Sequence, residues 1–400
     1  MPRRMRYDAL VVGARCAGAA TAMLMARNGL RVLVIERGAY GTDTLSTHAL
    51  MRGGVLQLQR WGVLPRIVAA GTPAVRHTIF QYGEDVLKID LKQGPGGDAL
   101  YAPRRTVLDR VLVDAAREAG AEVRYGHALT GLMQRRDGRI TGAVVLDRNG
   151  DSHEIAADLV VGADGLGSAV ARLVQAPMLR EGRHASAALY GHRAGLAESG
   201  YRWYYRPGAS AGIIPTNDGL HCVFVATPAR RFREQGRHDP AVEYRRVLAE
   251  VSADLAAEIA TSRLQGRMQI FAGRRGFLRK ASGPGWALVG DAGYFKDPLT
   301  AHGMTDALRD AALLAAAAGH GGDAAFANYE STRNLLSLPF FEATDAIASF
   351  AWDLEAARQH HQALSAAMKQ EVEYLAAMNA ADQDRQFTTP APISHEEKAA

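Results

Sequence analysis

A glycine-rich turn near the start of the chain, followed by one acidic residue, has the residue types needed to hold a dinucleotide. Residues 13–18 read Gly-Ala-Arg-Cys-Ala-Gly, and Glu36 lies eighteen positions after Gly18. Free amides at a helix N-terminus attract the negative charge of a pyrophosphate, and an acidic residue at about this spacing accepts hydrogen bonds from ribose hydroxyls. The pattern therefore predicts a dinucleotide site.

The elements around this turn have the order that such a site requires. An apolar run at 9–12 predicts a buried strand, and small residues predict a helix over 19–28. A second apolar run at 31–35 predicts the strand that ends in Glu36. Strand, glycine turn, helix, strand and acid together form the unit that binds a dinucleotide. The alternative is a buried strand–helix–strand unit that holds no ligand.

Arg15 departs from the usual Gly-x-Gly-x-x-Gly pattern. It stands where the middle glycine normally lets the backbone approach the pyrophosphate closely. Its side chain must either point away from the turn or lay its guanidinium against a phosphate. The sequence leaves both arrangements open.

Two further apolar runs end in an acidic residue beside a glycine. The run 157–162 leads into Asp164 and Gly165, and the run 285–289 leads into Asp291. A helix is predicted shortly after the second run. Asp291 therefore suits a ligand rich in hydroxyl groups, with an anionic edge of that ligand at the helix N-terminus.

The composition is that of an ordinary globular protein. The chain has 400 residues, of which 48% are hydrophobic and 22% charged, enough for two or three domains. A net charge of +5 is mild for this length and predicts no nucleic-acid partner. No apolar run approaches the ~20 residues that span a membrane, and two cysteines form no disulfide framework. We expect a cytoplasmic enzyme for a small molecule, and leave a homo-oligomer open.

The remaining pattern divides the chain into three parts, which together predict an α/β fold. A Rossmann-like nucleotide-binding domain comprises residues 1–75, 100–180 and 280–320, with helices at 52–60, 106–119 and 304–319 and strands at 121–125, 128–134 and 140–146. An inserted, mostly antiparallel substrate domain comprises 76–99 and 181–279, with strands at 76–81, 86–91, 186–192, 201–206, 209–214 and 221–227 and a helix at 240–259. A helical region at 321–381, kinked at Pro339, precedes a polar tail at 382–400.

In their order and spacing, these markers resemble the single-component (group A) FAD monooxygenases of the para-hydroxybenzoate hydroxylase type. Flavin halogenases and geranylgeranyl reductases are relatives of that family. The resemblance covers about residues 7–320 and rests on the glycine turn, Arg105 before a helix, Asp164-Gly165, and Gly290-Asp291. It implies that the nucleotide-binding domain binds FAD, and that FAD is held non-covalently.

The resemblance also assigns residues to the cofactor. Glu36 would bind the adenosine ribose and Asp291 the ribityl chain. Arg105 would contact the cofactor near its pyrophosphate and ribityl groups. The backbone amides of Gly303 and Met304 would face the flavin ring. The full set expected to contact FAD is Gly13, Arg15, Ala17, Gly18, Glu36, Arg37, Arg52, Arg105, Leu129, Asp164, Gly165, Asp291, Gly303 and Met304.

Two short segments differ from the family pattern. In the loop 298–303, Ala301 stands where a glycine is usual. Halogenases carry Trp-x-Trp-x-Ile-Pro, whereas residues 210–215 read Ser-Ala-Gly-Ile-Ile-Pro and have neither tryptophan. The second difference argues against halogenation.

The resemblance implies a monooxygenase. NADH or NADPH would reduce FAD, O2 would add to give a flavin C4a-hydroperoxide, and one oxygen atom would pass to an aromatic or polyene small molecule by hydroxylation or epoxidation. Two alternatives stay open. One is a flavin-dependent reductase of a prenyl double bond, and the other is an FAD-bound cyclase or scaffold without redox chemistry.

The sequence contains two histidines that are candidates for catalysis. His48 and His302 fall nearest the predicted flavin, and a histidine can deprotonate a phenol at neutral pH. A local hydrogen-bonding role is the alternative for each. We expect no metal site, because the pair His360-His361 lacks partners at ligand spacing.

Aromatic residues in the substrate domain are candidates for the pocket. Alternation along the strand at 201–206 predicts Trp203 and Tyr205 on one face and Tyr204 on the other. The face with Trp203 either lines a substrate pocket or packs in the core.

Overall fold

Strand β1 (Arg6–Val12) lies near the middle of the first sheet, and its apolar residues are buried from Ala9 to Val12. The computed structural model describes residues 6–46 and 48–388. Strand β1 pairs in parallel with β2 (Val32–Glu36) and with β8 (Ser152–Gly162). The parallel core continues to β5 (Glu122–Tyr125) beyond β2 and to β17 (Trp286–Leu288) beyond β8. The carboxyl ends of β1, β8 and β17 thus meet at one edge, where all three sequence markers fall.

Helices cover one face of this sheet and a three-stranded extension covers the other. Helix α1 (Cys16–Arg27) packs against α4 (Arg105–Glu118) and α9 (Gly303–His320). On the opposite face, β6 (Ala128–Gln134) and β7 (Ile140–Leu146) form antiparallel pairs with each other and with the start of β8. A short antiparallel strand, β16 (Ser282–Gly283), pairs with β17. These elements agree with the predicted nucleotide-binding unit.

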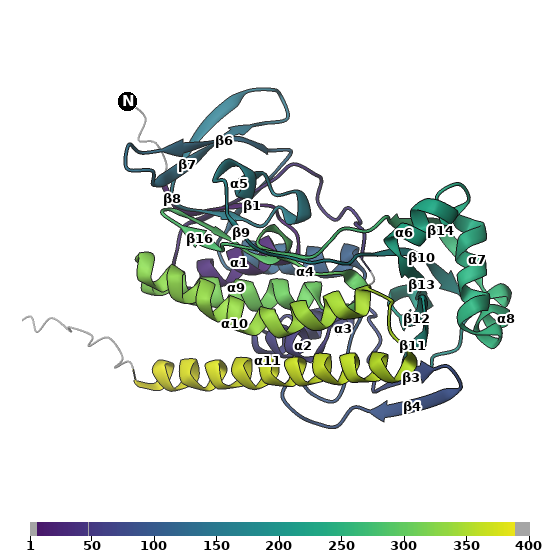
Figure 1. Ribbon diagram of the computed structural model, residues 1–400. Helices are drawn as coiled ribbons and strands as arrows, with labels where there is room; N and C mark the ends of the chain where they lie inside the picture. Colours follow the sequence, from purple (N-terminus) through teal and green to yellow (C-terminus); the bar gives the residue numbers. More distant parts are fainter. Residues whose placement is uncertain (1–5, 47, 389–400) are drawn as a thin grey trace, which may run out of the picture.

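The second sheet lies beside the first (Figure 1) and is antiparallel apart from one pair. Its strands follow the order β14 (Arg263–Phe271), β10 (Ser186–Ala194), β13 (His221–Pro228), β12 (Ala209–Pro215), β11 (Tyr201–Arg206), β3 (His77–Tyr82) and β4 (Asp85–Asp90). The exception is β3, which runs parallel to β11. The predicted hairpin β3–β4 therefore extends a sheet whose other strands lie more than a hundred residues further along the chain.

The outer face of the second sheet is covered by two helices where the sequence predicts one. Helices α7 (Pro240–Val251) and α8 (Ala253–Thr261) meet at Ser252, which has extended backbone torsions. The Ser252 hydroxyl accepts a hydrogen bond from the amide of Leu255 and thereby caps α8. The capping serine is the physical reason for the break that the prediction missed.

Several short elements escaped prediction. They are helix α3 (Leu64–Ala69), strand β14, and a small sheet of β9 (Met178–Glu181), β15 (Phe277–Arg279) and β18 (Tyr294–Phe295). Helix α2 itself (Arg52–Arg60) has the predicted bounds. The strands of the small sheet have two to four residues and are too short to show a hydrophobic period, whereas β14 has nine residues, none of which is fully buried, so that it shows no apolar face.

The C-terminal region consists of α10 (Asp323–Ala348) and α11 (Leu354–Thr388), which lie alongside α9 (Figure 1). Helix α10 continues through Pro339, and the chain breaks instead between the two helices, where Phe350 has a φ of +53°. Helix α11 extends through residues 382–388, which the sequence places in a polar tail, while 389–400 lie outside the described residues. None of the described helices is long and apolar enough to cross a membrane.

Packing of α7 on the second sheet can be tested with two valines of the same helix. Val247 is fully buried, whereas Val242 is 48% exposed. We expect Val247→Ala to lower the free energy of unfolding by roughly 2 kcal/mol, because it removes buried methyl groups and leaves a cavity. Val242→Ala should change it by less than about 0.5 kcal/mol. Urea denaturation measures both, and equal effects would contradict the arrangement of α7.

Candidate active site

In the glycine turn after β1, close backbone contacts at Gly13 and Gly18 leave no room for a side chain at either residue. Gly13 has a φ of +105°, and a Cβ there would lie 2.5 Å from the carbonyl oxygen of Ala163 at the end of β8. A Cβ at Gly18 would lie 1.8 Å from the carbonyl oxygen of Gly13. Glycine is thus required at both ends of the turn, and the N-terminus of α1 follows at Cys16.

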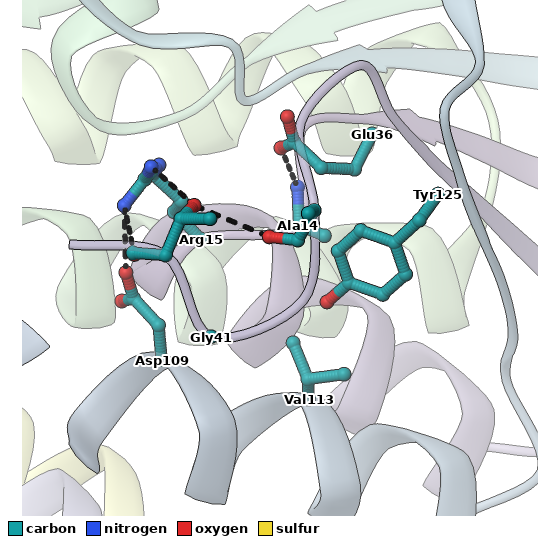
Figure 2. A pocket seen from close by; sticks show the side chains of 9 residues that line it. Ala14, Arg15, Glu36, Gly41, Asp109, Val113 and Tyr125 are labelled. Atoms are coloured by element: carbon teal, nitrogen blue, oxygen red, sulfur yellow. Dashed lines mark hydrogen bonds and ion pairs between the residues drawn. The ribbon is translucent and has the colours of Figure 1, made fainter. Parts of the chain in front are cut away.

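Arg15 shows which of its two arrangements the protein adopts. Its backbone φ is −87°, a value that needs no glycine. Its guanidinium leaves the turn and donates hydrogen bonds to the carbonyl oxygens of Thr42 and Asp43 and to the carboxylate of Asp109, at 3.2–3.3 Å (Figure 2). Asp109 also accepts three hydrogen bonds from Arg105, at 3.0–3.1 Å. Asp109 therefore bridges two predicted cofactor residues.

Asp109 is a site residue that the sequence analysis missed. It follows Arg105 by one helical turn in α4, a spacing at which an arginine and an aspartate on the same helix meet. That spacing was the available signal. The partnership with Arg15 on a distant segment has no signature in the sequence.

Glu36 lies against the glycine turn at the end of β2. Its carboxylate accepts a hydrogen bond from the amide of Ala14, at 2.9 Å (Figure 2). It also accepts one from the amide of Gly38, at 2.8 Å. It lines a small hollow together with Arg15, Asp109 and Tyr125. The neighbouring Arg37 is exposed and makes no hydrogen bond or ion pair among the described residues.

Asp291 follows β17 in a short 3-10 turn, Gly290–Ala292, and faces the start of α9. A Cβ added to Gly303 would lie 3.9 Å from its carboxylate. Burial raises the pKa of Asp291 to about 6, although Lys296 and Arg105 act to lower it. No described residue hydrogen-bonds to this carboxylate. A half-buried carboxylate without a protein partner among the described residues is suited to accept hydrogen bonds from the hydroxyls of a ligand.

Several other predicted cofactor residues serve the local structure. Asp164 accepts hydrogen bonds from the Ser168 hydroxyl, at 2.5 Å, and the Ala169 amide, at 2.6 Å, and so fixes the start of α5 (Ala169–Leu173). Gly165 has a φ of +74° in the same turn. Arg52, which is predicted to reach the cofactor, donates hydrogen bonds to carbonyl oxygens of the loop 92–97, and its contact with the cofactor stays a prediction.

The remaining predicted residues lie near the turn or near α9. Ala17 lies 3.2 Å from where a Cβ of Gly290 would be, which brings the first and third markers together. Leu129 is half-buried in β6, just after a backbone hydrogen bond from His127 to Glu36. Met304 is the second residue of α9, and its sulfur lies 4.0 Å from the Ser46 hydroxyl.

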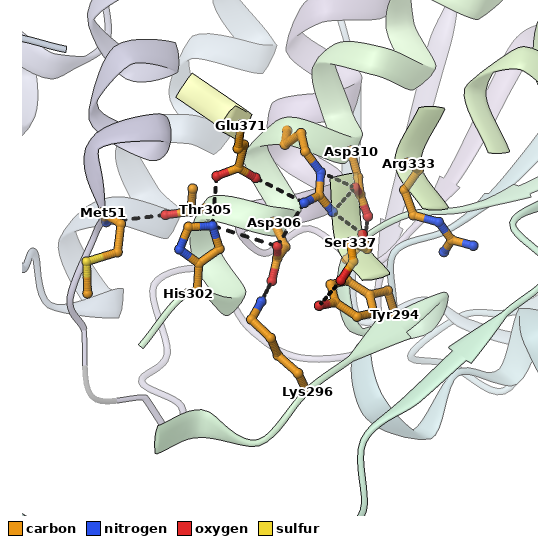
Figure 3. Close-up of polar contacts among 12 residues, drawn as sticks. Met51, Tyr294, Lys296, His302, Thr305, Asp306, Asp310, Arg333, Ser337 and Glu371 are labelled. Carbon is orange, nitrogen blue, oxygen red and sulfur yellow. Dashed lines mark hydrogen bonds and ion pairs between the residues drawn. The ribbon is translucent and has the colours of Figure 1, made fainter. Parts of the chain in front are cut away.

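A buried network of charges holds the first turns of α9 in place (Figure 3). The guanidinium of Arg309 is fully buried and donates to Asp306, Asp310 and Glu371 at 2.8–3.0 Å, and to the Ser337 hydroxyl at 2.9 Å. Glu371 comes from α11 and Ser337 from α10. The network thus joins α9 to both C-terminal helices.

His302 belongs to this network, at the residue before α9. Its Nε2 lies 2.8 Å from a Glu371 oxygen, and its ring stacks on Phe340 with 4.3 Å between centroids. His302, Asp306 and Glu371 lie close enough to present ligand atoms to one metal ion. However, Lys296 contacts Asp306, and Arg309 contacts both carboxylates. We therefore interpret the group as an ion-pair network that orients His302, which favours the structural alternative for this residue.

His48 forms a buried pair with His192 of β10. Their Nε2 atoms lie 2.9 Å apart, so one ring donates a hydrogen bond to the other. Burial, followed by the neighbouring His192, holds the pKa of His48 well below its ordinary range. Burial also lowers the pKa of His192 to about 4, with Arg104 adding to the effect. Both rings are therefore neutral at pH 7.

Two further features mark His48 as more than a core residue. Its φ is +69°, an uncommon conformation for a residue with a side chain, and such strain concentrates at functional sites. Its Nδ1 atom is buried and has no hydrogen-bond partner among the described residues. The sequence could not find His192, which lies 144 residues away.

The inner face of the second sheet supplies an apolar wall next to this pair. Tyr190, Trp203, Tyr205 and Phe224 are buried there, in one cluster with Ala49, Ala301 and Trp352. Tyr204 packs in the cluster on the opposite face, as alternation predicts. The Tyr205 ring packs on His361, 4.3 Å between centroids, and Trp203 packs near Phe224. Ala301 has a φ of +49°, which explains why its position usually belongs to glycine.

The two-sheet fold and the glycine turn define a dinucleotide-binding protein. The chain belongs to the family described as "FAD binding domain", whose profile matches residues 6–339.

Known relatives differ in their named activities. A digeranylgeranylglycerophospholipid reductase of Methanocella arvoryzae is 28% identical over 313 residues, which are 76% of this chain and 75% of the reductase. Aklavinone 12-hydroxylase RdmE of Streptomyces purpurascens is 26% identical over 352 residues, covering 78% of this chain and 64% of the hydroxylase. Among solved structures, a triple mutant of the flavin-dependent brominase Bmp2 has a TM-score of 0.79 at 18% identity, covering 96% and 100% of the two chains. The last likeness concerns the fold.

The residues at the ends of β1 and β17 fit FAD. The turn between Gly13 and Gly18 leaves the helix N-terminus open to a pyrophosphate, and the carboxylate of Asp291 has no protein partner. The family makes the chain an FAD-dependent oxidoreductase, and the relatives described above are named as a reductase and a hydroxylase.

The role of Asp291 can be tested by flavin affinity. We expect Asp291→Ala to weaken FAD binding at least tenfold, because a hydrogen bond to a charged group contributes about 1.5–3 kcal/mol. Titration of the apoprotein with FAD, followed by fluorescence, measures the affinity. The melting temperature of the apoprotein should not fall, because the half-buried carboxylate makes no hydrogen bond to a described residue. Unchanged FAD affinity would remove Asp291 from the site.

The low pKa of His192 predicts a specific acid sensitivity. A histidine ordinarily titrates near 6.5, so the unfolded chain binds this proton at a higher pH than the folded protein does. Stability should therefore fall as the pH falls from about 6.5 to 4, by up to about 3 kcal/mol from this group. His192→Asn should make that fall shallower. The matched substitution His153→Asn, at a half-exposed histidine, should not, and identical profiles would contradict the burial of the pair.

Proposed function

We propose that this protein is an FAD-dependent monooxygenase that uses NADH or NADPH and O2 to hydroxylate an aromatic small molecule. The observation that carries the proposal is the neutral, buried pair His48–His192 beside an aromatic wall, at the edge where the FAD-binding markers meet. A hydroxylation of this kind needs exclusion of water and a group that moves a proton, and the pair and the wall are suited to both.

FAD would be held by the residues at the strand ends. The glycine turn would face the pyrophosphate, Glu36 the adenosine ribose, and Asp291 the ribityl hydroxyls, while α9 would direct its N-terminus at the flavin ring. FAD supplies the electron transfer that lets one oxygen atom of O2 enter the substrate while the other leaves as water. The sum is substrate, O2, NAD(P)H and a proton giving hydroxylated substrate, water and NAD(P)+.

The protein's own contribution to the chemistry is a proton path through two imidazoles. A substrate hydroxyl would hydrogen-bond to Nδ1 of His48, the buried atom without a described partner. As His48 accepts that proton at Nδ1, it can release the proton on its Nε2 to Nε2 of His192. His192 would then hold the extra proton as an imidazolium until it releases the proton on its Nδ1 to solvent, since it is the more exposed ring of the pair, at 8% against 1%.

The aromatic wall would position the substrate and keep water out. Trp203 and Tyr205 are 6% and 8% exposed, and Trp352 closes the cluster from the segment between α10 and α11. Flat aromatic side chains favour stacking with an aromatic substrate. Exclusion of water would also limit the side reaction in which O2 is reduced without transfer of an oxygen atom to the substrate.

A second candidate is a flavin-dependent reductase of a prenyl double bond. It is favoured by the sequence relative named as a digeranylgeranylglycerophospholipid reductase, which aligns with three quarters of this chain. In that case the same wall would hold an isoprenoid, and His48 would supply a proton to carbon. The two candidates differ in whether oxygen enters the product.

Isotope labelling decides between the two. The FAD-loaded protein would be incubated with NADH or NADPH, 18O2 and a panel of phenols, with a geranylgeranyl lipid in parallel, and products analysed by mass spectrometry. We expect one 18O atom in an aromatic product and consumption of one O2 for each product formed. Reduction of the lipid without oxygen would support the reductase instead, and full conversion of a substrate by unreduced flavin would overturn both.

The histidine pair provides the matched variants. His48→Asn preserves the positive φ, because asparagine tolerates it, but removes the imidazole relay. We expect product formation to fall by about 100-fold, the usual contribution of a positioned acid or base. FAD affinity and the flavin spectrum should be unchanged. His153→Asn serves as the control, and wild-type turnover in His48→Asn would exclude the relay.

A further inference from the structure

A pocket lined by arginines lies away from the glycine turn and the histidine pair. It has a volume of about 280 Å3 and is bounded by the start of β10, the end of β13, the loop 272–276 and the end of α10. Its charged lining residues are Arg183, His184, Arg230, Arg233, Arg274 and Arg275. The predicted cofactor site uses none of them.

Most of this positive charge has no counter-charge. Arg230 pairs with Glu234 at 2.7 Å, and Arg183 lies 4.0 Å from Asp345. Arg233 and Arg275 make no ion pair or hydrogen bond among the described residues, and Arg274 contacts only the ring of Phe277. Three guanidinium groups therefore surround one hollow without an acidic partner, an arrangement whose mutual repulsion an anion would relieve.

The acidic residue nearest to the pocket is already engaged. Asp345 accepts hydrogen bonds from the amides of Arg183 and His184, at 2.9 and 3.0 Å, and lies 3.1 Å from Nδ1 of His184. Its side chain is only 14% exposed. Asp345 thus organises the pocket wall and leaves the guanidinium groups of the opposite wall free for a ligand.

The positive field extends inward from the pocket. Burial lowers the pKa of Arg279, and the charge of Arg274 lowers it further, while Asp164 acts in the opposite direction. Arg279 therefore lies within the influence of both the pocket and the second sequence marker. An anion bound beside Arg274 would reduce the repulsion between Arg274 and Arg279.

The pocket is also connected to the loop that precedes α9. Ala185, in the pocket wall, accepts a backbone hydrogen bond from Ala229. The next residue, Ser186, donates its amide and its hydroxyl to the buried carboxylate of Asp297, each at 2.6 Å. Asp297 caps the short turn Pro298–Thr300. The pocket wall is thus linked through Ser186 to the segment that precedes α9.

We propose that this pocket binds the phosphoryl groups of a small organic phosphate. Guanidinium forks match phosphate oxygens in a bidentate manner, and several arginines around one hollow favour an anion with two or more charges over a single carboxylate. The volume suits a diphosphate or a phosphorylated ribose. The ligand is either the nicotinamide dinucleotide that donates electrons or a phosphorylated substrate, and these share the recognised chemistry.

Inorganic pyrophosphate is the probe that tests the site without turnover. The FAD-loaded full chain would be titrated calorimetrically at low and high salt. We expect saturable binding at low salt that weakens as salt screens the charges. Arg233→Gln with Arg275→Gln should lower the affinity at least tenfold, because two charge-assisted contacts are lost. Both residues are exposed, so the flavin spectrum and the melting temperature should not change.

The matched control removes the same two charges elsewhere. Arg135→Gln with Arg136→Gln lies at the exposed turn between β6 and β7 and should leave pyrophosphate affinity unchanged. Equal losses in both double variants would mean that only net charge matters and would overturn the proposal, as would the absence of saturable binding in the wild type.

Competition identifies the source of the phosphate. If NADPH displaces pyrophosphate, and the pocket variant weakens NADPH binding to the same degree, the pocket holds the electron donor. If pyrophosphate binds but neither NADPH nor NADH displaces it, the pocket belongs to another phosphorylated ligand. Both results support the site, and neither depends on the reaction being a hydroxylation.

Discussion

The fully buried guanidinium of Arg309 is the group on which the arrangement of α9 and the C-terminal helices depends. A charge without water is tolerated only when partners surround it, and Arg309 has carboxylates from its own helix and from α11. Loss of one such partner would leave an uncompensated charge and cost about 3–5 kcal/mol. The position of Gly303 relative to Asp291 is therefore set by electrostatics as much as by apolar packing.

The two sheets divide the tasks of the site. The parallel sheet brings three strand ends to one edge, where backbone amides and Asp291 can hold a cofactor. The second sheet contributes a wall of rings and one member of the histidine pair. His48, on the segment between β2 and α2, is one of several residues of the first unit that form hydrogen bonds to the second. Ser186 of β10 and Asp297 form another such contact.

The sequence predicted what is encoded locally. Strands β1, β2, β8 and β17 and the glycine turn follow from short apolar runs and from residues that require positive φ. Partnerships over long separations could not be predicted, because the residues concerned are ordinary in their own surroundings: Asp109 with Arg15, His192 with His48, and Glu371 with Arg309. Arg52 shows a further limit. The family motif predicts a role for this residue, but it does not predict its hydrogen bonds to the carbonyl oxygens of the loop 92–97.

The order of these partners along the chain has a consequence for biosynthesis. Arg309 emerges from the ribosome 62 residues before Glu371, and β3 emerges long before β11, the strand beside which it lies. A nascent chain that has reached Arg309 therefore already contains every strand of both sheets, while Arg309 still lacks the carboxylate of Glu371 and has only those of Asp306 and Asp310. We expect a chain that stops before Glu371 to hold α9 less firmly, because a buried charge is destabilising when one of its partners is missing.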